Sequence, residues 1–173
     1  MNTLPNKITL MRIILIPIFL ILAYCNLMFA AFVVYIIACV SDFIDGYLAR
    51  KYNQVTNFGK FMDPLADKML VLAAMCFFIE SGQMPGWAVA IVLFREFAVS
   101  GLRLIAVEQN RVIAAAWSGK VKTTATMIAL GAMIVLPNIA FINILATAVI
   151  VITTLYSGIE YFIVNKDVFK EAD

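Results

Sequence analysis

Histidine is absent from this chain of 173 residues, and charged residues make up only 14% of it. The absence of histidine excludes a histidine general base, the usual zinc sites and phosphohistidine intermediates. Cysteine is scarce as well, and no two cysteines stand in a CxxC pair. We expect the three cysteines to be buried, unpaired apolar side chains: Cys25, Cys39 and Cys76.

The chain also lacks any long hydrophilic stretch. Hydrophobic residues make up 64% of the sequence, and the mean hydropathy is +0.96, whereas a soluble domain is about 45–50% apolar and about 25% charged. We therefore predict an integral membrane protein with a single domain over residues 1–173 and no expected nucleic-acid partner. The N-terminus has no convincing small-residue cleavage site, so the first apolar run is expected to be a retained helix.

Six apolar runs of membrane-spanning length predict an all-α fold with six transmembrane helices. Polar residues, glycine and proline interrupt the apolar sequence between these runs, as expected at helix ends. The breaks fall at Asn26, at 51–57, at 81–86, around 108–111 and at 137–138. The predicted helices cover residues 8–26, 29–50, 60–80, 86–107, 118–136 and 139–163.

Lysine and arginine fall on one side of this six-helix map. The opposite loops, around 27–28, 81–85 and 137–138, contain neither residue. Positively charged loops stay in the cytoplasm, which predicts that both termini are cytoplasmic in a multi-pass protein of the cell membrane. Arg12, Lys68 and Arg95 lie inside apolar runs, and a charge at that depth marks a functional candidate.

Four aspartates occur where two of the predicted membrane helices meet their shared loop: Asp42, Asp45, Asp63 and Asp67. Their spacings of three and four residues place each pair on one helix face. If the two helices fold back on each other at this loop, the two pairs lie at the same depth along the helices, so the four carboxylates would form one cluster. Each carboxylate costs roughly 2.5–3.5 kcal/mol in a membrane, and paired Mg²⁺ or Mn²⁺ ions would offset that cost. A cation pathway and a structural network with Lys and Arg are alternatives.

The aspartates belong to the pattern Asp42-x-x-Asp45-Gly46-x-x-Ala49-Arg50-(eight residues)-Gly59-x-x-x-Asp63-x-x-x-Asp67. This pattern resembles the signature of the CDP-alcohol phosphotransferase family at every fixed position. The resemblance implies two divalent cations, Mg²⁺ or Mn²⁺, held by Asp42, Asp45, Asp63 and Asp67, with Asp67 also the base for the acceptor hydroxyl. It further implies that the CDP group is held by Gly46, Ala49, Arg50 and Gly59, and that Asn6, Thr9 and Arg12 complete the nucleotide pocket.

Two further stretches, 95–103 and 118–123, resemble the bacterial branch of this family that transfers to sn-glycerol 3-phosphate. A doubly anionic acceptor needs a basic pocket, and these stretches bring cations to the cytoplasmic ends of the fourth and fifth helices. The usual excess of positive charge in cytoplasmic loops accounts for the position of Arg111. It does not account well for Arg95, which lies in the middle of an apolar run beside Glu96 and could form a buried ion pair with it. The candidates for the acceptor phosphate are Arg95, Arg103, Arg111, Lys120 and Lys122.

The resemblance therefore implies transfer of a phosphatidyl group from CDP-diacylglycerol to sn-glycerol 3-phosphate by an enzyme in the lipid bilayer, with CMP released. It also implies a homodimer. One alternative is a related enzyme with another acceptor, such as inositol phosphate, serine or a second phosphatidylglycerol. A divalent-cation transporter is the alternative from a different class, although the absence of acidic residues deep in the other half of the membrane argues against it. A phospholipase-D type of synthase is excluded because its chemistry requires histidine.

Overall fold

The structure is a computed structural model that describes residues 4–52, 57–109, 111, 113 and 116–167, without the side chains of residues 4–9, 42–52 and 57–67. Within the described residues the chain forms six helices and no strand. They are α1 (Leu4–Tyr24), α2 (Met28–Tyr52), α3 (Asn57–Glu80), α4 (Gly86–Glu108), α5 (Trp117–Val135) and α6 (Ala140–Val164). The predicted all-α fold and the six helical segments are confirmed.

The three loops between α1 and α2, α3 and α4, and α5 and α6 each contain one residue with left-handed backbone. These residues are Asn26 (φ 58°), Gly82 (φ 70°) and Asn138 (φ 65°). Glycine and asparagine tolerate this conformation better than other residues, so they permit the chain to reverse in a short turn. All three lie in breaks that the sequence predicted, and they fix an up-and-down order of antiparallel helices.

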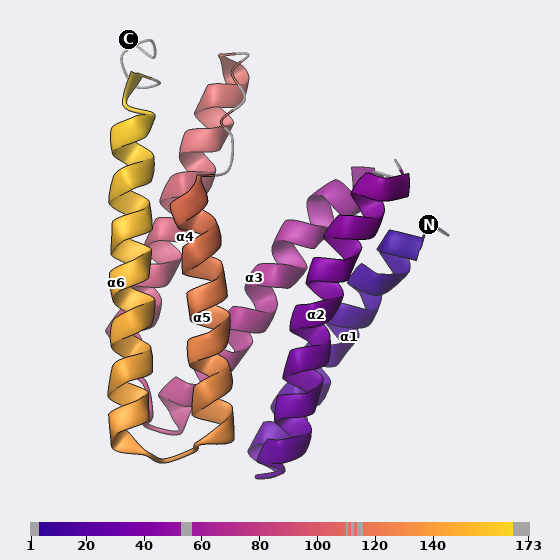
Figure 1. The fold of residues 1–173 in the computed structure, drawn as a ribbon, viewed down its shortest axis with the longest axis vertical. Helices are drawn as coiled ribbons and strands as arrows, with labels where there is room; N and C mark the ends of the chain where they lie inside the picture. Colours follow the sequence, from indigo (N-terminus) through magenta and orange to yellow (C-terminus); the bar gives the residue numbers. More distant parts are fainter. Residues whose placement is uncertain (1–3, 53–56, 110, 112, 114–115, 168–173) are drawn as a thin grey trace.

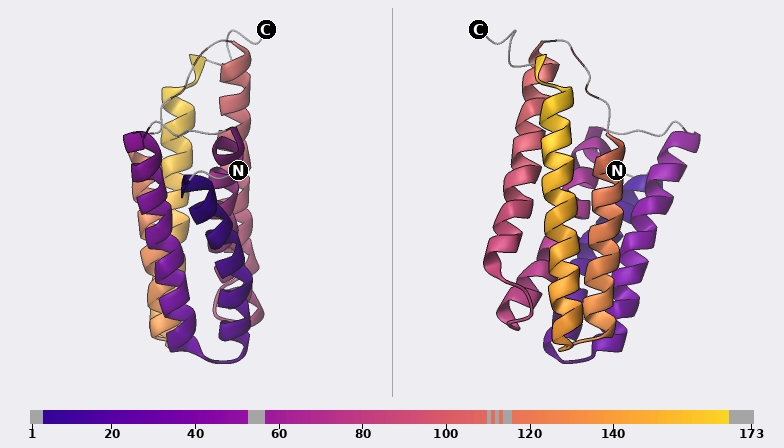
Figure 2. Two further views of the ribbon diagram at one scale, coloured as in Figure 1. Left: turned by 90° about the vertical axis from the view of Figure 1, so that its right-hand side faces the viewer. Right: turned by 60° about the vertical axis from the view of Figure 1, so that its left-hand side comes forward.

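The helices form two groups, α1 to α3 and α4 to α6 (Figure 1). Helix α1 packs on α2 and α3, while α6 packs on α4 and α5. The groups are joined because α2 and α3 contact α5, and α3 also contacts α4. The start of α1 and the end of α6 lie at the same end of the molecule as the ends of α2 and α4, as the views in Figure 2 also show.

The core contains two clusters of buried apolar residues. The larger cluster draws residues from all six helices and includes Phe19, Tyr35 and Phe78, which have at most 1% of their surface exposed. The smaller cluster joins α4 to α6. It contains Val99, Leu102, Ala106 and Tyr161, and it lies beside the charged residues described below.

The outer surface of the helices is strongly apolar. Phe94, Phe97 and Ile144 are 70–77% exposed, and an exposed apolar surface of this kind marks contact with lipid or protein. By length and apolarity, α6 is the one helix of the described residues that qualifies as a membrane span, while α1 and α2 contribute shorter apolar stretches over Leu10–Tyr24 and Met28–Ser41. The two tryptophans, Trp87 and Trp117, begin α4 and α5 and are exposed at opposite ends of the helices.

The prediction that the three cysteines are buried is wrong for two of them. Cys25 and Cys76 are exposed and Cys39 is half-buried, and no disulfide joins the three within the described residues. An apolar run shows only that a segment avoids water, because residues facing the bilayer and residues facing the core are both apolar.

Candidate functional site

The four aspartates of the signature lie on helical backbone, with Asp42 and Asp45 in α2 and Asp63 and Asp67 in α3. Their side chains lie outside the described residues, as do those of Asn6, Thr9, Ala49 and Arg50, and Gly46 and Gly59 lie in the same helical segments. Among the side chains that are described, no three acidic, cysteine or histidine groups gather as a metal site would require. The aspartate cluster therefore stays a prediction.

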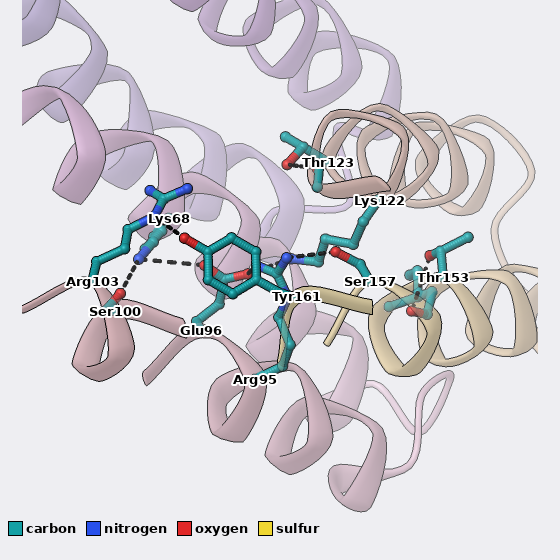
Figure 3. Close-up of polar contacts among 12 residues, drawn as sticks. Lys68, Arg95, Glu96, Ser100, Arg103, Lys122, Thr123, Thr153, Ser157 and Tyr161 are labelled. Carbon is teal, nitrogen blue, oxygen red and sulfur yellow. Dashed lines mark hydrogen bonds and ion pairs between the residues drawn. The ribbon is translucent and has the colours of Figure 1, made fainter. Parts of the chain in front are cut away.

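Glu96 is the centre of a charged cluster formed by α3, α4 and α5. Its Oε1 atom lies 2.8 Å from Lys122 Nζ and 3.1 Å from Arg95 Nη1, and its Oε2 atom lies 3.3 Å from Lys68 Nζ. The side chains of Lys122 and Arg95 are only 7% and 12% exposed, and Figure 3 shows these cations directed at the carboxylate. The expected Arg95–Glu96 ion pair is present.

This cluster has an excess of positive charge. Three cations surround one carboxylate, so two positive charges are unbalanced within the described residues. Buried charges are costly unless paired, and a site with surplus cations attracts an anion more strongly as water is excluded. The cluster is therefore suited to bind a small dianion.

A cavity of about 190 Å³ lies beside the cluster, between α3, α4 and α5. Lys68, Glu96 and Lys122 line it, and its volume equals that of about six water molecules at about 30 Å³ each. Thr126 also lines it, and its hydroxyl, in a residue only 1% exposed, has no hydrogen-bond partner in the described structure. Buried hydroxyls are nearly always paired, so this one marks a place where a polar ligand can bind.

Arg95 passes between two glycines that leave room for its side chain. A Cβ atom on Gly158 of α6 would lie 3.2 Å from Arg95 Cγ, and one on Gly119 of α5 would lie 3.6 Å from Nη2. At the far end of the side chain, Nη2 donates a hydrogen bond of 2.5 Å to the hydroxyl of Ser157. Arg95 is thus fixed at three helices while it contacts Glu96.

Arg103 lies two turns further along α4, on the same face as Glu96, and it contacts α6. Its Nε atom donates a hydrogen bond of 2.8 Å to the hydroxyl of Tyr161. The guanidinium carbon also lies 5.5 Å from the centre of the Tyr161 ring, within the range of a cation–π contact. Between the two, Ser100 accepts a hydrogen bond of 3.3 Å from Lys68.

The structure does not bring all five predicted acceptor cations together. Lys122 is buried in the cluster, whereas Lys120 is exposed on another side of α5, because two positions turn a helix by about 200°. Arg111 is exposed beyond the end of α4. Arg12, predicted for the nucleotide pocket, is fully buried in α1. Their roles at the site stay predictions.

Sequence reasoning missed Ser157, Gly158 and Tyr161, which all lie in α6. They read as part of an apolar helix, and their contacts with Arg95 and Arg103 join positions 58 to 63 residues apart in the chain. One signal was present: Ser157 and Tyr161 are four residues apart, so they share a helix face.

Comparison with known proteins decides the family. The family model described as CDP-alcohol phosphatidyltransferase matches residues 2–156. The chain belongs to the CDP-alcohol phosphatidyltransferase family. A Bacillus subtilis (strain 168) protein named CDP-diacylglycerol–glycerol-3-phosphate 3-phosphatidyltransferase is 43% identical over the whole of both chains. Proteins with the same name from Escherichia coli (strain K12) and Shigella flexneri serotype 5b (strain 8401) are 39% identical over 91% of this chain and 92% of theirs.

CDP-alcohol phosphatidyltransferases depend on divalent cations in general, and the donor set of this chain fits such ions. Carboxylate oxygens are the ligands that hard divalent cations prefer. The continuous helical backbone of α2 over Asp42 and Asp45, and of α3 over Asp63 and Asp67, agrees with the one-face spacing that the sequence predicts.

The family match ends at residue 156, so Ser157 and Tyr161 lie just beyond it.

Proposed function

We propose that this CDP-alcohol phosphatidyltransferase transfers the phosphatidyl group of CDP-diacylglycerol to sn-glycerol 3-phosphate and releases CMP. The single observation that carries the choice of acceptor is the cluster around Glu96, whose surplus of two positive charges suits a phosphorylated alcohol. The relatives named for this reaction support it, at 39–43% identity over most of the chain.

In the proposed reaction, the 1-hydroxyl oxygen of glycerol 3-phosphate attacks the phosphorus that carries the diacylglycerol. A new P–O bond forms to the acceptor, the P–O bond to CMP breaks, and the hydroxyl proton passes to the carboxylate of Asp67. Lys122 and Lys68 line the cavity, where they would neutralise and orient the acceptor phosphate. Holding the hydroxyl in line with the phosphorus accounts for much of the expected rate enhancement.

Asp42, Asp45 and Asp63, with Asp67 beside them, would hold the divalent cations, Mg²⁺ or Mn²⁺. When bound, such ions neutralise the negative charge of the pyrophosphate. Gly46 and Gly59 have no side chains that would obstruct the approach of the CDP group to α2 and α3, and Asn6, Thr9, Ala49 and Arg50 would contact it.

We also propose that all six helices span the membrane with both termini in the cytoplasm. At 1.5 Å per residue, helices of 19 to 25 residues are about 28–38 Å long, against about 30 Å for the apolar layer of a bilayer. The active site would then open to the cytoplasm, where a water-soluble acceptor can reach it. A homodimer remains part of this proposal through the family resemblance.

The test is CMP release from CDP-diacylglycerol by the purified protein in detergent, with one candidate acceptor at a time. We expect release with sn-glycerol 3-phosphate and little release with serine, inositol phosphate or no acceptor. Glycerol is the matched control, because it differs from the acceptor only by the phosphate. If another alcohol elicited CMP release and glycerol 3-phosphate did not, the reaction class would stand and the proposed acceptor would be wrong.

A further inference from the structure

We propose that the C-terminal half of α6 positions the cations that bind the acceptor. Tyr161 orients Arg103 so that the terminal nitrogens of Arg103 bind the acceptor phosphate. Ser157 holds Arg95 in the position where it contacts Glu96. This inference rests on the proposed function. Ser157 and Tyr161 would be positioning residues, since they act through the two arginines and do not touch the substrate.

Tyr161 is built as a rigid support. Only 2% of its surface is exposed, and its ring lies in the smaller apolar cluster with Val99, Leu102 and Ala106. Close packing of this kind leaves the ring little freedom to move. Its hydroxyl therefore has a defined position, and it accepts the hydrogen bond from Arg103 Nε at 2.8 Å.

The atom of Arg103 that bonds to Tyr161 determines which N–H donors of its guanidinium remain available to a ligand. A guanidinium has five N–H donors, and the hydrogen bond to Tyr161 uses the single one on Nε. Among the described residues, no hydrogen bond or ion pair occupies Nη1 or Nη2 of Arg103. These two nitrogens form the edge that binds two oxygens of one phosphate at once.

Arg95 shows the opposite use of its guanidinium. Both terminal nitrogens are occupied, Nη1 by Glu96 and Nη2 by Ser157, and Nε is the buried atom without a described partner. Each terminal nitrogen of Arg95 therefore already donates one of its two N–H groups, so a phosphate would have to share these nitrogens with Glu96 and Ser157. Arg95 serves instead to hold Glu96, whose Oε1 atom also accepts the hydrogen bond from Lys122.

Holding Arg103 in advance matters because this residue is exposed. An exposed arginine samples many rotamers, and fixing them when the ligand binds weakens affinity. The contacts with the Tyr161 hydroxyl and ring restrict that freedom before the acceptor arrives. A purely structural link between α4 and α6 would affect both substrates alike, so the two roles can be distinguished.

The test is a double-mutant cycle on the full-length enzyme in detergent, with Tyr161→Phe, Arg103→Ala and the double variant. A hydrogen bond to a charged group changes affinity by about tenfold or more. We therefore expect Tyr161→Phe to raise the KM for glycerol 3-phosphate about tenfold and to leave the KM for CDP-diacylglycerol within about twofold. In the Arg103→Ala background it should have no further effect, because interacting residues are not additive.

Tyr156→Phe is the matched control, because it makes the same chemical change on the same helix at a residue 66% exposed. It should leave both KM values unchanged. Arg103→Lys is a second probe that leaves Tyr161 intact: lysine keeps the charge but lacks the fork, so its KM for glycerol 3-phosphate should also rise. A thermal melt of each variant checks that it is folded.

An unchanged KM for glycerol 3-phosphate in Tyr161→Phe would overturn the inference. Equal rises in both KM values, or additive effects in the cycle, would do the same by showing a structural role alone. Failure of the proposed function looks different, because the wild type would then release CMP with another phosphorylated alcohol only. The same cycle with that acceptor would still decide whether Tyr161 acts through Arg103.

Discussion

At the scale of single residues, Glu96 determines how the basic side chains are arranged. Without it, Lys68, Arg95 and Lys122 would repel one another in a region where two of them are almost fully buried. With it, the three cations converge on one carboxylate, and among the described side chains this leaves a surplus of positive charge beside the cavity. Glu96 thus allows a dense group of cations to exist before an anion binds.

Lysines 120 and 122 provide a comparison within one helix. Lys122 is buried and bonded to Glu96, whereas Lys120 is exposed. Removing a charge-assisted contact costs about 1.5–3 kcal/mol, so Lys122→Ala should raise the KM for glycerol 3-phosphate about tenfold or more. Lys120→Ala should have the smaller effect. Steady-state kinetics with each substrate varied in turn measure both, and a larger effect at Lys120 would place the phosphate on the other side of α5.

The aspartates yield a prediction about metal removal. Asp42→Asn, Asp45→Asn and Asp63→Asn should each abolish CMP release, because an amide is a weaker ligand than a carboxylate for a hard divalent cation. Treatment with EDTA should abolish CMP release by the wild type, and added Mg²⁺ or Mn²⁺ should restore this activity. Thermal melts in detergent provide the folding control. Strong activity in two of the three variants, or in EDTA, would contradict the predicted metal site.

At the scale of elements, α4 packs against α6 through a small residue as well as through polar contacts. Gly158 of α6 lies against the stem of Arg95, with a distance of 3.2 Å between Arg95 Cγ and the place where a Cβ atom would lie. Gly101 of α4, by contrast, has no atom within 4 Å of that place. Both glycines lie inside helices, so they differ in surroundings and not in backbone.

This difference predicts opposite outcomes for the same substitution. Gly101→Ala should stabilise the protein by about 0.5–1 kcal/mol, the usual gain from replacing a helical glycine. Gly158→Ala gains the same helical preference, but Arg95 must move by a few tenths of an ångström, so stability should gain less or fall and the KM for glycerol 3-phosphate should rise. Thermal melts and acceptor kinetics measure the two variants side by side. Equal behaviour would show that Arg95 adjusts without consequence.

The elements themselves could be predicted from the sequence with small errors. Glycine, asparagine and proline interrupt the apolar runs at the turns, and α4 begins at Gly86 as predicted. The first helix shows the largest difference, since it begins at Leu4 and not at Ile8, because polar residues in a first turn do not prevent helix formation. Helix faces could not be predicted as well, as Cys25 and Cys76 show, since bilayer and core select the same apolar residues.

At the scale of the whole molecule, the order of the helices places the start of α1, the ends of α2 and α4 and the end of α6 at one end of the molecule (Figures 1 and 2). This arrangement follows from an even number of antiparallel helices. It also explains why the site was only partly predictable. Arg95, Glu96 and Lys122 carry charges that stand out in apolar runs, whereas Ser157 and Tyr161 gain their roles only when α6 packs beside α4.

Cysteine labelling in intact cells tests the orientation. In a background without the three native cysteines, Gln83→Cys and Asn138→Cys should react with an impermeant thiol reagent from outside. Both positions lie in loops at the end without termini. Lys166→Cys, at the other end, should react only after the cells are opened. The reverse pattern of labelling would place the site on the side of the membrane opposite to the proposed one.

The positions of the two tryptophans have a consequence for spectroscopy. Trp87 and Trp117 are the only tryptophans of the chain. Trp87 lies in the first turn of α4 and Trp117 begins α5, and these two helices run in opposite directions. Each single-tryptophan variant, made with Trp→Phe at the other position, therefore carries a fluorophore at one end. In a bilayer, brominated lipids with the quencher at different depths would report where each end lies, without any attached label. Under the proposed topology, the two natural tryptophans would therefore report the depth of both helix starts in the bilayer.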